Sequence, residues 1–467
     1  MRYQIKPILL LIILTLLPAC AGNQTMPPGL EEQLSYTPQV ILDYEADLEW
    51  WKLYEDPQLD QLIQTALEHN LDLARSAIGI NRALYQANRL GADLLPSFSG
   101  NLSGQSGNDL KSGDNTTRTF DAQFGVRYEI DLWRRLSDSA SAQEWEYLAS
   151  IEDKEAIRLL LINNVIETYY HLAYLQGALL ATRDNIAHYQ RIEELTKTKY
   201  LAGKMDALEP AQARQAWLAA ENNALNLESQ QKEAELTLRN LLNLRPQESL
   251  SPNYPDLLKV YLPPVDLDVP LAVLAHRPDL RAAENRLQKA FKSLHASQKS
   301  WYPTLSLGAN LTSASGVLGR MFDLPQFLGF VTIDLPFLNW NRLQWDIKIS
   351  EADFESAKLD FAQSLTNALN EVDNYNFQFL KAREILDKTQ EKYTYDVAIS
   401  GYYDTRYRFG ANELSDWLNA LNTEASSRLT LINNHYTMLR YQTALYKSLA
   451  GRYTARQPEL TSEGVQP

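Results

Sequence analysis

Strict alternation of apolar and polar residues marks one long predicted strand near residues 120–133. Every even-numbered position from Phe120 to Leu132 is apolar, and the odd-numbered positions between them are polar or glycine. A period of two that lasts this long exceeds the usual length of a strand in a globular protein. Weaker or shorter alternation predicts three further strands, near residues 96–106, 303–313 and 326–337.

Helical spacing of apolar residues fills most of the chain between these strands. Residues 56–94 predict a first helix, because Asp56 can cap its start and Pro57 suits the first helical position. A counterpart runs from about residue 271 to residue 300. Helices far longer than usual are typical of coiled-coil packing. The pattern predicts two very long helices, each followed by a return helix: 137–201 and 206–242, then 341–409 and 413–451.

An internal repeat at an offset of 207 residues relates the two halves of the chain. A period this long indicates a duplicated structural unit rather than a solenoid of short repeats. The two units span about 56–255 and 256–453, and each contains a helix, two strands, a long helix and a return helix. The matched pairs include Asp72 and Asp279, Ala83 and Ala290, Pro96 and Pro303, Val165 and Val372, Tyr200 and Tyr407, and Gly203 and Gly410.

Each predicted strand pair has an apolar face and a polar face, with aromatic residues near the strand ends. Such strands are typical of a β-barrel that faces lipid. The alternative is a half-buried sheet in a soluble domain. Four strands cannot close a barrel, and an open sheet edge is not tolerated in lipid, so several chains would have to share one barrel. The aromatic residues near the ends are Trp133, Trp301, Tyr302 and Trp340.

The N-terminus predicts a secretory signal peptide over residues 1–19. Arg2 and Lys6 precede an apolar run of about ten residues, too short to serve as a comfortable membrane anchor. Cys20, the only cysteine, follows Ala19, and this ending resembles the bacterial lipobox, in which the cysteine is lipidated and becomes the new N-terminus. We therefore expect a covalent lipid on Cys20. The alternative is a core cysteine near an ordinary cleavage site.

Composition narrows the classes of function. The 467 residues include 44 Lys and Arg and 58 Asp and Glu, a formal net charge of −14 that disfavours nucleic-acid binding. A single cysteine excludes an intrachain disulfide, CxxC redox chemistry and a cysteine-rich zinc site. No HExxH metal motif, nucleophile elbow or phosphate-binding loop occurs. His188, Arg191 and Glu194 form an ordinary charged helix face, so we expect no enzyme, metal or cofactor.

Taken together, these features resemble the TolC-like outer membrane efflux protein family, specifically its lipoprotein branch of the OprM and NodT type. Residues 128–133, Tyr-Glu-Ile-Asp-Leu-Trp, resemble the second strand of that branch, with Arg134 where a glycine is usual. The resemblance runs from Cys20 to about Tyr453 and depends on the order and spacing of several short motifs. These are Trp50-Trp51, Asp56-Pro57-Gln58-Leu59, Arg277 to Glu284, Tyr302-Pro303, Glu371-Val372 and Arg406 to Gly410.

The resemblance implies an α+β membrane protein that assembles as a homotrimer. Three protomers would form a twelve-stranded outer-membrane β-barrel, continuous with a long α-helical periplasmic barrel and a small mixed equatorial domain. Residues 20–55 would be a lipidated extension and residues 454–467 a flexible tail. Transport would be passive, with a periplasmic adaptor joining the duct to an inner-membrane pump, expected to be of the RND type. The residue after Cys20 is Ala21 rather than an aspartate, which would suggest retention in the inner membrane. The resemblance therefore points to the outer membrane and its lipid.

The same resemblance implies a gate at the periplasmic end, closed by an iris with an acidic ring just after Gly410. Ser415 and Asn419 stand where relatives in this branch carry leucine and aspartate, so Glu413 or Asp416 could supply the acidic group instead. Three symmetry-related carboxylates would repel one another, which would raise their pKa values. The alternative is a solvated helix start, where acidic residues favour the helix dipole.

The turns between the long helices and their return helices would form the tips that meet the adaptor. Their glycines are expected to have positive φ, whether or not a partner docks there. Trp217 and Trp417 are expected to pack rather than to bind a ligand. The tip residues are Tyr200, Gly203, Tyr407, Gly410 and Ala411.

Three functions remain open at this point. The first is an exit duct for drugs or other small solutes. The second keeps the fold but exports a protein or peptide beside an ABC transporter, as in type I secretion. The third is a lipoprotein scaffold that binds partners without conducting. The resemblance favours efflux, but the sequence names neither the cargo nor the pump.

Overall fold

The computed structural model describes residues 29, 44–108, 116–250, 252–263, 265 and 271–455. The expected signal peptide, the lipidation site Cys20 and most of the expected C-terminal tail lie outside these residues. The chain divides into two compact units. The first holds the long strands and comprises Gly79–Ile151 and Ala282–Gln363, and the second holds the helical turns and comprises 44–78, Glu152–Arg281 and 364–455.

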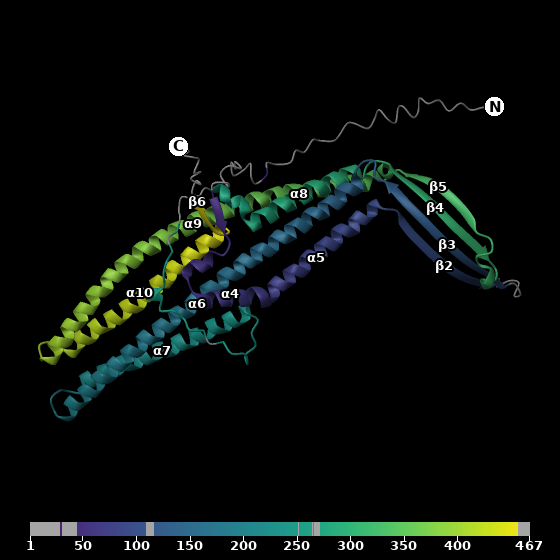
Figure 1. The fold of residues 1–467 in the computed structure, drawn as a ribbon. Helices are drawn as coiled ribbons and strands as arrows, with labels where there is room; N and C mark the ends of the chain where they lie inside the picture. The colour runs from purple at the N-terminus through teal and green to yellow at the C-terminus, as the bar shows by residue number, and fades with distance from the viewer. Residues whose placement is uncertain are drawn as a thin grey trace, which may run out of the picture. The chain divides into compact units, whose positions relative to one another are not determined.

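One antiparallel sheet of four strands forms the first unit's β-structure, in the order β2-β3-β4-β5 (Figure 1). β3 of the first repeat pairs with β4 of the second, from Phe120 opposite Ser315 to Ile130 opposite Leu305. The two predicted strand pairs therefore join into a single sheet, and β2 and β5 are its edges. The strands span Ser97–Asn108 (β2), Thr116–Ile130 (β3), Thr304–Ser315 (β4) and Gln326–Asp334 (β5).

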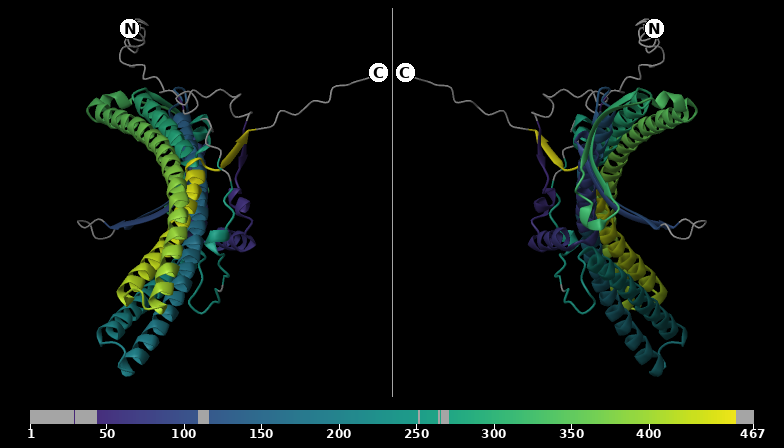
Figure 2. Two further views of the ribbon diagram at one scale, coloured as in Figure 1. Left: turned by 90° about the vertical axis from the view of Figure 1, so that its left-hand side faces the viewer. Right: turned by 90° about the vertical axis from the view of Figure 1, so that its right-hand side faces the viewer.

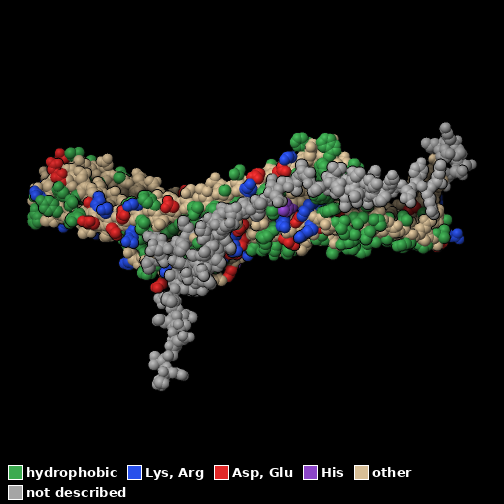
Figure 3. Space-filling model, turned by 90° about the horizontal axis from the view of Figure 1, so that it is seen from above, with side chains coloured by type: hydrophobic (Ala, Val, Ile, Leu, Met, Phe, Trp, Pro, Cys, Tyr) green, Lys and Arg blue, Asp and Glu red, His purple; other side chains and the backbone are tan. Residues whose placement is uncertain are grey.

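The register places most of the apolar side chains of the four strands on one face. Directly opposed residues of an antiparallel pair share a face. Tyr128 lies opposite Leu307, and Leu307 lies opposite Val331. Phe327 and Val331 are 76% and 66% exposed, and Figure 3 shows hydrophobic side chains gathered over this unit, on the right of the view. An exposed apolar face of this extent marks a surface that lipid or another chain covers.

The opposite face of the same sheet is mostly polar. One row contains Asn101, Gln123, Thr312 and Gln326, in directly opposed positions. Leu328 and Phe330 are exceptions, and the ring of Phe330 covers the backbone of Gly308, where any added side chain would collide with it. Glycine suits this position because the ring of Phe330 takes the space that a Cβ would fill.

β3 ends at Ile130, short of the predicted residue 133, because the next residue caps a helix. Asp131 accepts hydrogen bonds from the backbone N–H groups of Leu136 and Ser137 at 3.0 and 2.8 Å. Arg134, between them, has a φ of 61°. This left-handed conformation is the one that glycine adopts most readily, which explains why a glycine would suit that position. β5 likewise ends at Asp334 rather than at 337.

Helices α6 (Arg135–Leu201), α8 (Pro278–Lys299) and α9 (Trp340–Arg408) begin or lie in the first unit. Lys292 and Lys299 of α8 pair with the buried carboxylate of Asp138 on α6. On its other side, α8 meets α9 through the rings of Phe291 and Phe354, whose centroids lie 5.6 Å apart. Among the described residues, no helix is both long and apolar enough to cross a membrane.

Residues 56–94, expected as one helix, form two: α4 (Pro57–His69) and α5 (Leu71–Gly91). Asn70 is the break, because its backbone is extended and its side-chain oxygen accepts hydrogen bonds from the N–H groups of Asp72 and Leu73. It therefore acts as the N-cap of α5. The predicted start of α4 is confirmed, since Asp56 caps it and Pro57 occupies the first turn.

Aromatic residues dominate the core of the second unit. Four of these aromatic side chains are at most 2% exposed: Trp50, Tyr169, Tyr170 and Tyr446. The expected extension and tail contribute to this unit, which corrects two boundaries. Trp50 belongs to a short turn of 3-10 helix, and β1 (Tyr44–Asp47) pairs with β6 (Arg452–Ala455). Residues 454 and 455 thus belong to a strand, because backbone pairing with β1 holds them.

A buried arginine joins the motifs on which the resemblance depends. The Arg277 side chain is 8% exposed and donates to Asp279 at 2.7 and 3.0 Å, to Glu371 at 2.8 Å and to the carbonyl of Ser448 at 2.7 Å. Burial alone would raise the pKa of Asp279, but the hydrogen bonds from Arg277 outweigh it and hold that pKa below its ordinary value. Arg277 therefore ties the start of α8 to α9 and to the end of α10 (Leu414–Ser448).

Candidate functional site at the helix turns

Two helical hairpins of the second unit end in equivalent turns (Figures 1 and 2). α6 leads into α7 (Leu208–Leu241), and α9 leads into α10. Gly203 and Gly410 have φ of 67° and 72°, the positive values expected from the sequence. The N–H of Lys204 in one turn and of Ala411 in the other each donate to the carbonyl five residues earlier, both at 2.9 Å. The two repeats thus end their long helices with the same C-cap.

Replacing Gly410 with alanine is expected to lower the unfolding free energy by about 1–2 kcal/mol, the cost of a left-handed conformation for a residue with a Cβ. Nothing lies within 4 Å of the Cβ position, so backbone strain alone sets this cost. Gly401 lies inside α9 with the same open space, and Gly401→Ala should instead stabilise by about 0.5–1 kcal/mol. Thermal unfolding of both variants measures the contrast, and shifts of the same sign would contradict it.

The tip residues of the two turns differ in exposure. Tyr200 is 45% exposed and Ala411 is exposed, so both can meet a partner. Tyr407 is expected at the tip by its match to Tyr200, but it is only 6% exposed and cannot form a docking surface. Its ring stacks on Trp417, with centroids 5.3 Å apart, and Lys199 lies 4.6 Å above it. The expectation for Trp417 as a packing residue agrees with this contact.

Three polar contacts, called the hairpin ties below, join the hairpin of the first repeat to that of the second. Each joins residues that are far apart in the sequence. Asn422 and Arg428 are on α10, Asp184 and Tyr189 on α6, and Glu209 is on α7. The ties are Tyr189 Oη to Asn422 Oδ1 at 2.5 Å, Arg428 Nη1 to Asp184 Oδ2 at 3.0 Å, and Tyr407 Oη to Glu209 Oε2 at 3.0 Å.

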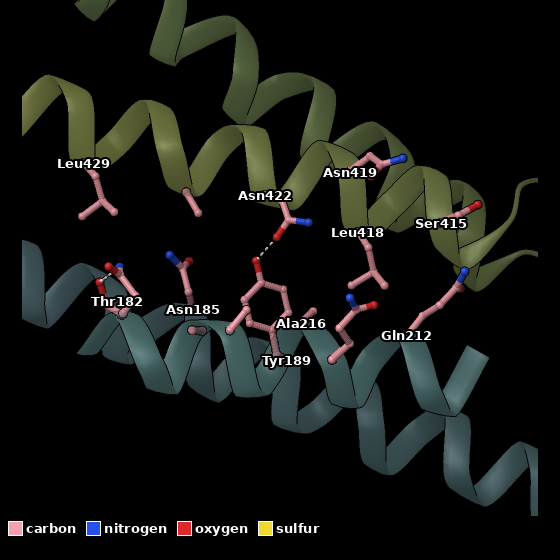
Figure 4. A pocket seen from close by; sticks show the side chains of 15 residues that line it. Thr182, Asn185, Tyr189, Gln212, Ala216, Ser415, Leu418, Asn419, Asn422 and Leu429 are labelled. Carbon is pink, nitrogen blue, oxygen red and sulfur yellow. Dashed lines mark hydrogen bonds between the residues drawn. The ribbon is translucent and has the colours of Figure 1, made fainter. Parts of the chain in front are cut away.

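An apolar cluster packs beside the hairpin ties. It draws on all four helices, with Ile192 of α6, Ala213 of α7, Tyr407 of α9 and Leu418 of α10 among its members. Figure 4 shows Leu418 directed from α10 toward the opposing helices, next to the Tyr189–Asn422 bond. Burial raises the pKa of Tyr189 to about 12, and Glu424 contributes to the rise, so the hydroxyl remains a hydrogen-bond donor at physiological pH.

The four gate candidates lie on different sides of the start of α10. Glu413 is the exposed N-cap residue, and its carboxylate accepts a hydrogen bond from Ser415 Oγ at 3.2 Å. Asp416 is exposed in the first turn and lines a groove of about 240 Å³ between α9 and α10, together with Asn419. Ser415 lines a different space, the cleft between α10 and the α6–α7 hairpin, and Asn419 borders both.

The groove beside Asp416 and Asn419 contains a second carboxylate. Asp396 of α9 lines it and pairs with Lys392 at 2.5 Å. Burial would raise the pKa of Asp396, but hydrogen bonds from Lys392 and Ser427 lower it overall. Asp416 has no ion-pair partner among the described residues, so it is the candidate with a free negative charge next to this groove. Whether these residues form a ring depends on the assembly, and the acidic ring stays a prediction.

The hairpin ties were not identified by sequence reasoning. Tyr189 and Asn422 are 233 residues apart, and neither belongs to a matched pair of the repeat. Each side chain alone is ordinary on a polar helix face. Only the packing of the two hairpins brings these groups together. Within the described ranges, no three His, Cys, Asp or Glu side chains come together as metal ligands.

Comparison with known proteins gives a consistent result. The family model for outer membrane efflux proteins matches residues 62–244 and 269–451, two ranges that are displaced by the same 207 residues as the repeat. An uncharacterized protein of Haemophilus influenzae is 42% identical over 97% of this chain and 100% of its own length. Toxin and drug export protein A of Aggregatibacter actinomycetemcomitans is 40% identical over 97% of this chain and 99% of its length.

A solved structure supports the same fold. The outer membrane protein VceC of Vibrio cholerae superposes with a TM-score of 0.80 and 21% identity, over 87% of this chain and 100% of that one. At this identity the match concerns the fold alone. It supports the predicted α+β architecture of four strands and long helical hairpins.

Proposed function

The chain belongs to the outer membrane efflux protein family, and we propose that it is the exit duct of a tripartite efflux system for drugs or other small solutes. Family members are outer-membrane channels that extend into the periplasm and work with adaptors and inner-membrane pumps. They are transport ducts rather than enzymes. As the resemblance to this family implies, transport through the duct would be passive, with the inner-membrane pump supplying the energy.

The observation that carries this proposal is the continuous apolar face of the four-stranded sheet. In lipid, each backbone polar group of a sheet must be paired, so an open edge is excluded. β2 and β5 are both edges in a single chain. Three copies, each supplying four strands, would pair β5 of one protomer with β2 of the next and close a barrel of twelve strands. The polar face would then line the lumen.

We propose that the hairpin ties hold the periplasmic end closed. They connect the two hairpins of one protomer, with Tyr407–Glu209 next to the turns and the other two ties farther along the helices. Separation of the hairpins would widen the opening between protomers. Glu413, Ser415, Asp416 and Asn419 follow the second turn immediately and would line that opening. The free carboxylate of Asp416 makes it the residue that we expect to face the solute and attract cations.

The double variant Tyr189→Phe with Arg428→Ala is expected to open the gate. It removes a neutral hydrogen bond and a largely exposed ion pair, together about 2 kcal/mol, or roughly a 30-fold shift toward the open state. Uptake of a large hydrophilic antibiotic in growing cells measures the leak. Tyr395→Phe, an exposed tyrosine of α9 that belongs to none of the ties, is the matched control. Equal susceptibility of the double variant and the control would refute the role of the ties.

A covalent lipid on Cys20 would anchor the mature chain in the outer membrane, with cleavage after Ala19. This proposal comes from the sequence, since Cys20 lies outside the described residues. Replacing Cys20 with alanine should abolish incorporation of radioactive palmitate into the protein. The strands would still insert, so the variant should remain in the outer-membrane fraction. Palmitate incorporation into the Cys20→Ala variant would contradict the assignment.

A second candidate function is the export of a protein. The relative that is 40% identical is named a toxin and drug export protein. The name of that relative therefore includes both classes of cargo. The fold suits either task, because the pump selects the cargo. The RND type remains our expectation for the partner pump, with an ABC transporter as the alternative.

A photoreactive residue in place of Ala411 tests both candidates in living cells. This side chain is exposed at the second turn, where an adaptor would dock. Captured proteins are identified by mass spectrometry. An adaptor together with an RND pump supports efflux, and an adaptor together with an ABC transporter supports protein export. Capture of no periplasmic partner, in cells where the protein reaches the outer membrane, would count against both.

A further inference from the structure

A cleft of about 470 Å³ lies between α10 and the α6–α7 hairpin, beside the Tyr189–Asn422 tie (Figure 4). Its volume falls within the range of about 300–1,000 Å³ that is usual for small-molecule sites. Carboxamides are the dominant side chains of its lining and come from all three helices. They are Asn185, Gln212, Gln215, Asn223, Asn419 and Asn422.

Among the described residues, no charged side chain lines this cleft. The lining that the structure describes contains no Asp, Glu, Lys, Arg or His, and its tyrosine, Tyr189, has a pKa of about 12. The groove among α6, α9 and α10 in the same unit is different, since Arg191, Asp404 and Glu424 line it. An anion or a cation would gain nothing by leaving water for the uncharged cleft, because no opposite charge would compensate its desolvation. The lining therefore selects a neutral ligand.

Several of these carboxamides are available to a ligand. Asn422 bonds to Tyr189 and Asn223 bonds to Thr182, but Asn185 and Gln212 have no hydrogen-bond partner in the part of the chain that the structure describes. Figure 4 shows both directed toward α10. Each free carboxamide offers an acceptor and two donors, so the pair can satisfy hydroxyl and amide groups of either polarity.

Small apolar residues supply the rest of the lining. Ala216, Ala219 and Ala220 form a shallow surface on α7, and Leu418 and Leu429 face it from α10. Apolar patches among amide groups suit a ligand with C–H faces and polar edges. A pyranose ring has this form, with axial hydrogens on its faces and hydroxyl groups around its rim. An acetamido substituent adds an N–H and a C=O that match a carboxamide in both directions.

We propose that this cleft binds a neutral oligosaccharide bearing acetamido groups, of about disaccharide size. The ligand would contact α10 on one side and the α6–α7 hairpin on the other. It would therefore bind best when the hairpin ties are formed, and by linkage it would stabilise the tied arrangement. Binding itself does not depend on conduction. Only its effect on the gate rests on the proposed function, so the two can fail separately.

Binding of N,N′-diacetylchitobiose to the purified full-length protein in detergent tests the proposal, with saturation-transfer NMR as the readout. We expect saturable binding that is the same at pH 6 and pH 9 and at low and high salt, because no ion is involved. Asn185→Leu combined with Gln212→Leu should weaken it at least tenfold. Asn222→Leu, an exposed carboxamide on α7 that does not line the cleft, is the matched control and should leave it unchanged.

Other probes define the ligand class. The deacetylated, cationic disaccharide and N-acetyl-dialanine amide should not bind measurably. Affinity that rises from disaccharide to tetrasaccharide would indicate a glycan strand as the source, and constant affinity would indicate a free sugar. Filling the cleft with Ala219→Trp should abolish binding. Absence of saturable binding, equal binding by the cationic disaccharide or the peptide, or unchanged binding in the Ala219→Trp variant would overturn the proposal.

Discussion

Replacing Val331 with arginine is expected to prevent assembly of the protein in the outer membrane. Val331 lies within β5, is 66% exposed and shares the apolar face with Leu307 of the neighbouring strand. An arginine on the lipid face of a barrel strand costs about 2–4 kcal/mol near the bilayer midplane. The proposed trimer incurs this cost in each of three protomers. The summed cost is comparable to the unfolding free energy of a whole domain.

Thr332→Arg is the matched control for this prediction. Thr332 is adjacent in the same strand but lies opposite Ser306 on the polar face, where a charged side chain would meet water in the lumen. Outer-membrane fractionation and the electrophoretic mobility of the unheated assembly measure the outcome. We expect the control to assemble and the Val331→Arg variant to be degraded. If both variants assemble equally well, the apolar face is not the lipid-facing surface.

Replacing Arg277 with methionine is expected to lower the unfolding free energy by about 3 kcal/mol, the lower end of the cost of removing one partner from a buried ion pair, because Arg277 is buried whereas the Asp279 side chain is 50% exposed. Asp279 and Glu371 both lose a partner, and the carbonyl of Ser448 loses its donor. The lower end of the range applies because Lys447 still reaches Glu371 at 3.3 Å. Arg281→Met is the control, since that side chain is 52% exposed and lies 3.8 Å from Glu152. It should change stability by less than about 1 kcal/mol.

The same cluster predicts a dependence on pH. The pKa of Asp279 is lower in the folded state than its ordinary value of 3.8, so its contribution to stability is complete above pH 3.8 and is lost as the pH falls through the folded-state pKa. Arg277→Met removes the cause of that shift. Denaturant unfolding at pH 7 and at pH 3 should therefore show a smaller acid-induced loss in the variant than in the wild type. Equal losses would show that Asp279 is not the acid-sensitive group.

Patterns that persist over many residues made the strands and the duplication predictable. The alternation from Phe120 to Leu132 and its weaker counterparts locate all four strands, because a two-residue period separates one apolar face from one polar face. The predicted α+β efflux-channel fold is confirmed by the family match and the superposition on VceC. The matched turns at Gly203 and Gly410 follow for the same reason, since positive φ favours glycine.

Features that depend on single residues or on contacts distant in the sequence were less predictable. Asn70 breaks the first helix because its side chain caps α5, although an asparagine in a helical pattern gives no reliable signal of a break. Residues 44–54 and 452–455 join the second unit through pairing and packing that local sequence does not encode. Tyr407 is buried and Tyr200 exposed although the repeat equates them. The hairpin ties depend in the same way on contacts across the two repeats.

The most direct test of the duct is the accumulation of a fluorescent dye, a known substrate of the native efflux systems, in cells that lack this protein. We predict that the deletion raises accumulation, and that the wild type and Thr332→Arg restore efflux whereas Val331→Arg does not. Unchanged dye accumulation in the deletion strain, with the partner pump present and active, would contradict the account. Full restoration by Val331→Arg would contradict it equally.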